Sequence, residues 1–219
     1  MINDRIDRNS RLTGLAVTND QLTLSAPNWD HRVYGLDTGL NRSIHIHLFD
    51  SLGASLLQGL LVLKAAELAE FGRQPEDIVE ELRRVRANSG LLLTVDTFER
   101  LIASGRIGRG PALVGRLLAI KPILGLAKDG AVVRYGQALG RTRAKAELLR
   151  ILREQIPLEA RKVRFGVVQV GMPEIVEEIS QELRAEYGRD VEILSAPVTP
   201  VIATHVGVGT WAVAYLVED

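Results

Sequence analysis

Apolar and polar positions first follow a regular pattern at residues 43–49, where they alternate and predict a strand. The apolar run over residues 52–69 is too long for a strand and contains three charged or amide side chains. It therefore predicts a buried helix rather than a membrane span, with Asp50 and Ser51 as its caps. Pro75 opens a second predicted helix, which ends near Arg86.

The second half of the chain mixes short strands, helices and a hairpin. Asp129-Gly130 lies between two apolar runs, and this dipeptide is typical of a type I′ hairpin turn. Strands are predicted over residues 91–95, 121–124, 163–170, 191–194, 201–204 and 211–217. Helices are predicted from a cap at Asp96 or Thr97 to Gly105, then over residues 111–119, 142–156 (capped by Thr142) and 172–187.

These patterns predict an α/β protein with two lobes. Strand–helix alternation in residues 1–88 predicts a parallel α/β N-terminal part. Residues 89–219 predict a C-terminal mixed sheet covered by helices on one face. The boundary is expected at residues 88–91, and a cleft between the lobes could hold a ligand.

Composition narrows the possible functions. The 27 Lys and Arg residues balance the 27 Asp and Glu residues, so net charge gives no support for nucleic-acid or membrane-surface binding. The sequence contains no Cys, which excludes disulfides and thiolate metal sites and favours a reducing compartment. The N-terminus is polar and charged, unlike a signal peptide, so we expect a cytoplasmic protein.

Two segments could bind an anion, although each has a simpler structural explanation. Residues 204–210 end a predicted strand and contain His205, Gly207 and Gly209. Backbone N–H groups near these glycines could bind an anion, or the glycines could serve a hairpin. Arg141 could clamp a carboxylate or phosphate, or it could simply precede a helix cap.

Three further segments are explained more simply by structural roles than by a functional site. Residues 105–110 interleave Gly and Arg but lack the Lys-Ser or Lys-Thr ending of a P-loop, and a turn explains them at least as well. His45 and His47 share a strand face without a third ligand, so we expect no metal site. Ser51 has no base beside it. Spacing alone therefore indicates no catalytic triad, metal site or cofactor site.

A longer ordered series of segments resembles the DegV family. The series begins at Phe49-Asp50-Ser51 and covers about residues 44–219. The family's first segment, with an Asp-Ser strand end, a Thr-Ser loop and a Ser-Gly-Thr turn, is expected to be missing, and Val208 stands where the family usually has Pro. The matching segments are residues 98–107 (FERLIASGRI), 117–124 (LLAIKPIL), 129–130 (DG), 141–146 (RTRAKA) and 205–210 (HVGVGT).

The resemblance implies two α/β lobes that bury the acyl chain of a long-chain fatty acid between them. It also implies that His205 hydrogen-bonds the carboxylate, that Arg141 lies near the head group, and that Gly207 and Gly209 allow close backbone approach. Some family members present the carboxylate to a fatty acid kinase, which would be the partner here.

We therefore expect a binding protein without enzymatic activity and without a cofactor. One alternative is an interaction or regulatory domain that keeps the fold without the ligand. Another is a hydrolase or phosphotransferase that uses His205 with Arg141.

Overall fold

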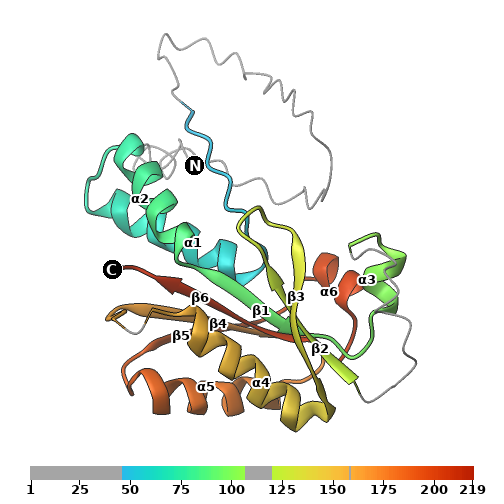
Figure 1. Ribbon diagram of the computed structural model, residues 1–219. Helices are drawn as coiled ribbons and strands as arrows, with labels where there is room; N and C mark the ends of the chain where they lie inside the picture. Colours follow the sequence, from blue (N-terminus) through green and yellow to red (C-terminus); the bar gives the residue numbers. More distant parts are fainter. Residues whose placement is uncertain (1–45, 107–119, 158) are drawn as a thin grey trace, which may run out of the picture.

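The computed structural model describes residues 46–106, 120–157 and 159–219 (Figure 1). Its six strands form one mixed sheet in the order β3-β2-β1-β6-β4-β5. Only β4 and β5 pair in parallel, and every other neighbouring pair in this sheet is antiparallel. The strands are β1 (Gly90–Thr94), β2 (Ile120–Leu126), β3 (Val132–Leu139), β4 (Val163–Gln169), β5 (Glu192–Pro197) and β6 (Trp211–Val217).

Helices cover both faces of this sheet. On one face α1 (Leu56–Glu70) and α2 (Pro75–Ala87) pack against the even-numbered side chains of β6, such as Ala214. On the other, α4 (Gly140–Gln155) and α5 (Glu174–Tyr187) pack against the odd-numbered ones (Figure 1). Every residue of β6 is buried, which explains why its sequence is continuously apolar rather than alternating.

The predicted α/β class with a mixed sheet is confirmed, but its details differ from the prediction. Both faces carry helices, because the described residues 46–88 supply α1 and α2 as a cover for the second face. Within those residues no strand forms, and residues 46–49 of the predicted strand are irregular. A strand needs a neighbour for its backbone hydrogen bonds, and all six described strands lie within residues 89–219. The division into residues 1–88 and 89–219 stays a prediction.

The predicted strand at residues 201–204 is wrong. These residues belong to helix α6 (Pro200–Val206), which begins with Pro200 and ends at Gly207 with φ 81°. The Ala203 N–H donates to the Thr199 carbonyl, and the Gly207 N–H donates to the Ala203 carbonyl. A short apolar run has no period that separates strand from helix, and here the proline at the first turn decides for helix.

The predicted helix caps are also wrong. Asp50 and Ser51 accept hydrogen bonds from Leu52 and Gly53 in local turns, and both lie at least five positions before Leu56, where α1 begins. Helix α3 (Glu99–Ala103) begins after Phe98 without a side-chain cap, and Thr142 lies inside α4.

The Asp129-Gly130 hairpin forms between β2 and β3, but its turn differs from the prediction. Only Gly130 has a positive φ, of 83°, and its N–H donates to the Ala127 carbonyl. The loop is therefore a three-residue type I turn with a left-handed glycine rather than a type I′ turn. The predicted helix at residues 111–119 lies outside the described residues.

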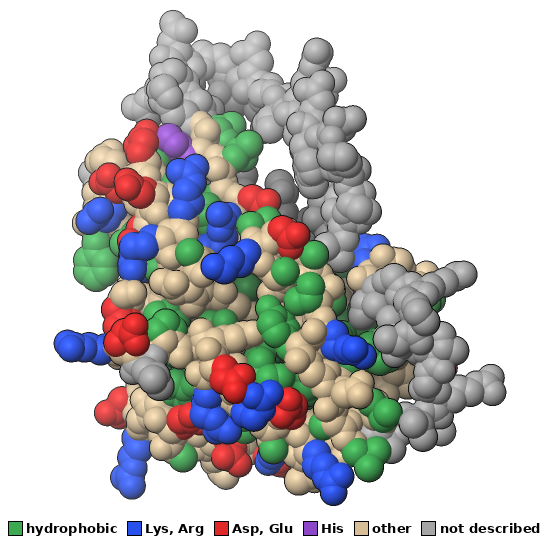
Figure 2. All heavy atoms as spheres, viewed as in Figure 1, with side chains coloured by type: hydrophobic (Ala, Val, Ile, Leu, Met, Phe, Trp, Pro, Cys, Tyr) green, Lys and Arg blue, Asp and Glu red, His purple; other side chains and the backbone are tan. Residues whose placement is uncertain are grey.

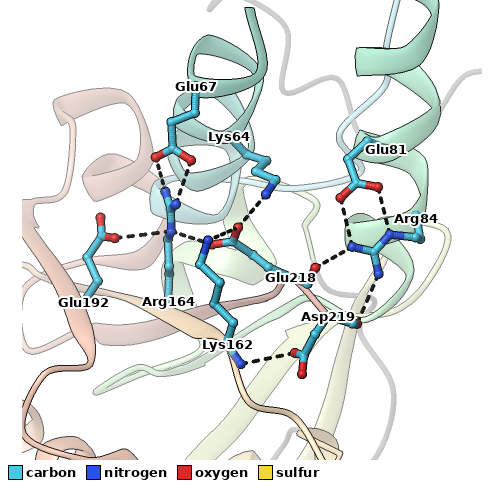
Figure 3. A network of polar contacts seen from close by, with 9 residues as sticks. All are labelled: Lys64, Glu67, Glu81, Arg84, Lys162, Arg164, Glu192, Glu218 and Asp219. Carbon is cyan, nitrogen blue, oxygen red and sulfur yellow. Dashed lines mark hydrogen bonds and ion pairs between the residues drawn. The ribbon is translucent and has the colours of Figure 1, made fainter. Parts of the chain in front are cut away.

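A network of ion pairs fixes α1 to the end of the sheet where β6 terminates (Figure 3). Arg164 on β4, with a side chain 7% exposed, makes two hydrogen bonds to the Glu67 carboxylate of α1. Glu218, with a side chain 1% exposed, lies 2.5 Å from Lys64 and 3.0 Å from Lys162. Buried charges need this pairing, since each one alone would destabilise the fold by several kcal/mol.

The same network shifts the pKa values of its carboxyl groups. The hydrogen bond from Arg164 lowers the pKa of Glu67 below its usual value. Burial acts to raise the pKa of Glu218, but hydrogen bonds from Lys64 and Lys162 outweigh burial and lower that pKa. Both carboxylates are therefore more stable in the charged form in the folded protein than in the unfolded chain.

Candidate functional site

The candidate site lies at the end of the sheet opposite the ion-pair network. Here β1 and β4 end, and β2 and β6 begin. Residues 207–210, which we call the glycine loop, connect α6 to β6 at this end. Helices α3 and α6 pack beside the loop through a small apolar cluster that contains Val95, Leu101 and Val206 (Figure 1).

Both glycines of the loop adopt a backbone conformation that favours glycine. The φ angle is 81° at Gly207 and 86° at Gly209. Their N–H groups already donate to backbone carbonyls, Gly207 to Ala203 at 2.8 Å and Gly209 to Val170 at 2.9 Å. These two N–H groups are therefore not available to an anion, while anion binding by other backbone N–H groups near the glycines stays a prediction.

Side chains of the protein itself fill the space beside each glycine. A Cβ atom added at Gly207 would lie 2.9 Å from Cδ of Arg100, and one added at Gly209 would lie 2.2 Å from Oδ2 of Asp96. The absence of a side chain thus allows Arg100 and Asp96 to lie directly against the loop. The groups that approach the two glycines in this structure are Arg100 and Asp96. Close approach of a ligand to the same glycines stays a prediction.

Asp96 joins the glycine loop to two cationic side chains. Its Oδ1 lies 2.8 Å from Nζ of Lys121, and its Oδ2 lies 3.7 Å from Nη2 of Arg141. The antiparallel register of β1 and β2, extended beyond Thr94, places Asp96 opposite Lys121. This pair was not predicted from the sequence, where Asp96 was interpreted only as a possible helix cap. A polar residue directly after a buried strand was the available signal.

The structure brings some of the predicted site residues together. Arg141 lies in the first turn of α4 and is linked through Asp96 to Gly209. His205 lies in the last turn of α6, rather than at a strand end, and it is half-buried. It precedes the glycine loop by two residues, so it belongs to the same end of the sheet.

Arg100 adds a third positive charge to this end of the sheet. Its Nη1 atom donates to the Thr204 carbonyl of α6 over 3.4 Å. Arg100 thus lies against Gly207, and the Asp96 carboxylate lies against Gly209. Lys121 and Arg141 reach the loop indirectly, because both pair with Asp96. Such a positive local field favours an anionic ligand.

The other candidate residues do not form a site among the described residues. His47 lies 3.3 Å from a Glu76 carboxylate oxygen, and His45 lies outside the described residues. The described part of the chain contains no group of three potential metal ligands, and the prediction of no metal stays a prediction. The 105–110 segment is described only to residue 106, where Gly105 has a φ of 70° and ends the α3 region.

The visible surface does not suggest a second site. A shallow hollow at the end of α5 is bordered by Arg184, Gly188 and Arg189, far along the sheet from the glycine loop. Acidic and basic side chains are interspersed on the face seen in Figure 2. Arg153 of α4, for example, pairs with Glu186 of α5. Among the described helices, none is both long enough and apolar enough to cross a membrane.

Comparison with known proteins establishes the family. The model of a family described as an uncharacterised protein of the DegV family matches residues 33–218. The chain belongs to the DegV family. Protein DegV of Bacillus subtilis (strain 168) is 31% identical over 174 residues, which cover 79% of this chain and 61% of that protein. The chain thus spans about three fifths of the length of the curated DegV relatives that it matches.

Solved structures of the DegV family share the fold. A DegV family protein from Thermus thermophilus, described as binding fatty acid, is 33% identical with a TM-score of 0.72, and the match covers 78% of this chain and 61% of that one. DegV of Bacillus subtilis, described as a fatty acid binding protein, is 31% identical with a TM-score of 0.67, covering 78% and 60%. The predicted family membership is therefore confirmed.

Proposed function

We propose that this protein binds a long-chain fatty acid whose carboxylate lies beside the glycine loop. The observation that carries the proposal is the excess of positive charge there, where Lys121 and Arg141 pair with Asp96 and Arg100 lies against Gly207. His205 adds an imidazole that can donate a hydrogen bond to a carboxylate. Charge-assisted hydrogen bonds of this kind are about twice as strong as neutral ones.

The acyl chain would supply most of the affinity, at about 0.8 kcal/mol for each buried CH₂ group. Apolar side chains suited to contact it flank the proposed carboxylate position. Val201 on α6 is 63% exposed and Val208 in the glycine loop is 71% exposed. Burial of both against an acyl chain would remove apolar surface from water. Enclosure of the chain between two lobes remains part of the proposal.

The solved relatives support this ligand class, because several are described as fatty acid binding or lipid binding proteins. They are longer than this chain, which covers about three fifths of their length. Binding by this chain must therefore be measured on the protein itself. The proposal includes no catalytic step and no cofactor.

A partner kinase is the finer part of the proposal. The Arg141 side chain is 57% exposed, so it can contact a ligand head group and a partner protein at the same edge. A fatty acid kinase that phosphorylates the carboxylate would approach from this side. The competing function is an interaction domain that keeps the fold without the ligand.

Lipid analysis followed by titration distinguishes these functions. Denaturing extraction and mass spectrometry of the purified chain should release fatty acid. In titrations, His205→Ala should weaken binding about 5- to 150-fold, because a buried charged group loses a donor. Arg141→Ala should weaken it less if Arg141 serves the partner. Arg143→Ala, exposed on the same helix, is the matched control and should leave affinity unchanged.

Circular dichroism should give the same spectrum for every variant. No bound lipid and no titration by the wild-type chain would favour the interaction domain. Unchanged affinity in His205→Ala would remove this residue from the site.

A further inference from the structure

Asp96 lies in the segment that follows β1, and a connecting residue needs no particular side-chain contacts. Asp96 nevertheless contacts Lys121, Arg141 and the glycine loop. Its carboxylate contacts the Lys121 ammonium at 2.8 Å, and the Lys121 side chain is only 14% exposed. Lys121 also donates to the Asp96 backbone carbonyl over 3.3 Å. The Lys121 ammonium is therefore held by two oxygens of Asp96 and is largely removed from solvent, whereas the Asp96 side chain is 35% exposed.

Arg141 is bound much more loosely to the same carboxylate. The distance between its Nη2 atom and Oδ2 of Asp96 is 3.7 Å, which is too long for a hydrogen bond. The guanidinium can turn toward an incoming anion without first breaking a strong contact. Asp96 thus neutralises Lys121 and leaves Arg141 available.

The glycine loop fixes where the Asp96 charge lies. Oδ2 of Asp96 is 2.2 Å from the position of a Cβ atom at Gly209, so the carboxylate is pressed against the loop. Any anion bound beside Gly209 must therefore lie close to this negative charge. With Lys121 neutralised, the site offers Arg141 and Arg100 to the ligand and opposes each additional negative charge.

We propose that Asp96 determines the charge selectivity of the head-group site, favouring a monoanionic carboxylate over a dianionic phosphate monoester. This inference rests on the proposed function. The repulsion energy between Asp96 and a dianion is about twice that between Asp96 and a monoanionic carboxylate at the same distance. Asp96 is thus a specificity-determining and positioning residue, and it takes no part in a chemical step.

The test compares hexadecanoate with hexadecyl phosphate at about pH 8 and about 0.15 M salt, where the phosphate monoester is a dianion. The measured quantity is the ratio of the two dissociation constants. Asp96→Asn keeps the side-chain shape against Gly209 and removes the charge. It should shift the ratio toward the phosphate by about tenfold, because one extra charge contact near a protein surface exceeds the 1.4 kcal/mol that a factor of ten requires.

Two further variants keep the test decisive. Lys121→Met removes one positive charge and should shift the ratio in the opposite direction, which tests the proposal even if Asp96→Asn does not fold. Asp190→Asn makes the same change in net charge on an exposed residue at the far end of the sheet, and it should leave the ratio unchanged.

The outcomes separate the two proposals. Equal weakening of both ligands in Asp96→Asn, with an unchanged ratio, would show a merely structural role and overturn the selectivity proposal alone. A folded wild-type chain that binds neither ligand would overturn the proposed function, and the selectivity proposal with it.

Discussion

Replacement of Gly209 by Ala tests the packing on which the site depends. The new Cβ atom would lie 2.2 Å from Oδ2 and 2.4 Å from Cγ of Asp96, so the carboxylate must move. Positive φ for alanine costs about 1–2 kcal/mol, and displacement of Asp96 from Lys121 adds about 1–2 kcal/mol. We expect Gly209→Ala to lower the free energy of unfolding by about 2–4 kcal/mol in urea denaturation.

A matched control separates backbone strain from the clash. Gly72 has a φ of 76°, but a Cβ atom there would meet nothing within 4 Å, so Gly72→Ala should cost only about 1–2 kcal/mol. In an Asp96→Ala background the cost of Gly209→Ala should fall to the same value. Equal costs for both glycines in the wild type, or an unchanged cost in the Asp96→Ala background, would refute this reasoning.

Three further predictions concern the charged network and a half-buried tyrosine, Tyr187. Glu218→Gln should lower the free energy of unfolding by about 3 kcal/mol, because it removes the charged partner of the buried Lys64 ammonium, whereas Glu186→Gln at an exposed pair should cost less than about 1 kcal/mol; equal urea midpoints would contradict this. The pKa values of Glu67 and Glu218 are lowered in the folded state. The free energy of unfolding that these carboxylates contribute should therefore persist above about pH 4.5 and be lost as pH falls through their folded-state pKa values. Urea titrations that give the same free energy of unfolding between about pH 5 and pH 2 would argue against this. Burial raises the pKa of Tyr187 to about 12, so stability should decline between about pH 10 and pH 12, and less so in Tyr187→Phe, as followed by denaturation at each pH.

Much of the fold follows from local sequence pattern. The apolar run of β6 and the proline at the start of α2 predicted those elements close to their observed bounds. Local pattern failed where the chain has two acceptable conformations, as at α6, or where a strand needs a distant partner, as at residues 46–49. The second helix-covered face was also missed, because packing of α1 against β6 depends on contacts between distant parts of the chain.

The site was predictable only in part, for a related reason. His205, Arg141 and the two glycines were proposed from short local segments and from the resemblance to the DegV family, and their roles in ligand binding stay predictions. Asp96 and Lys121 are 25 positions apart and meet through the register of two antiparallel strands. The sequence around a single aspartate does not show whether its side chain caps a helix or pairs with a cation. The fold makes that distinction.

Fatty acid titration of the purified chain tests the central claim most directly. Delipidated wild type, titrated with hexadecanoate in isothermal calorimetry, should show saturable binding with a stoichiometry near one. Its affinity should drop about 5- to 150-fold in His205→Ala and stay unchanged in Arg143→Ala. A folded wild-type chain that gives no saturable heat, or a His205→Ala variant that binds as tightly as the wild type, would contradict the account.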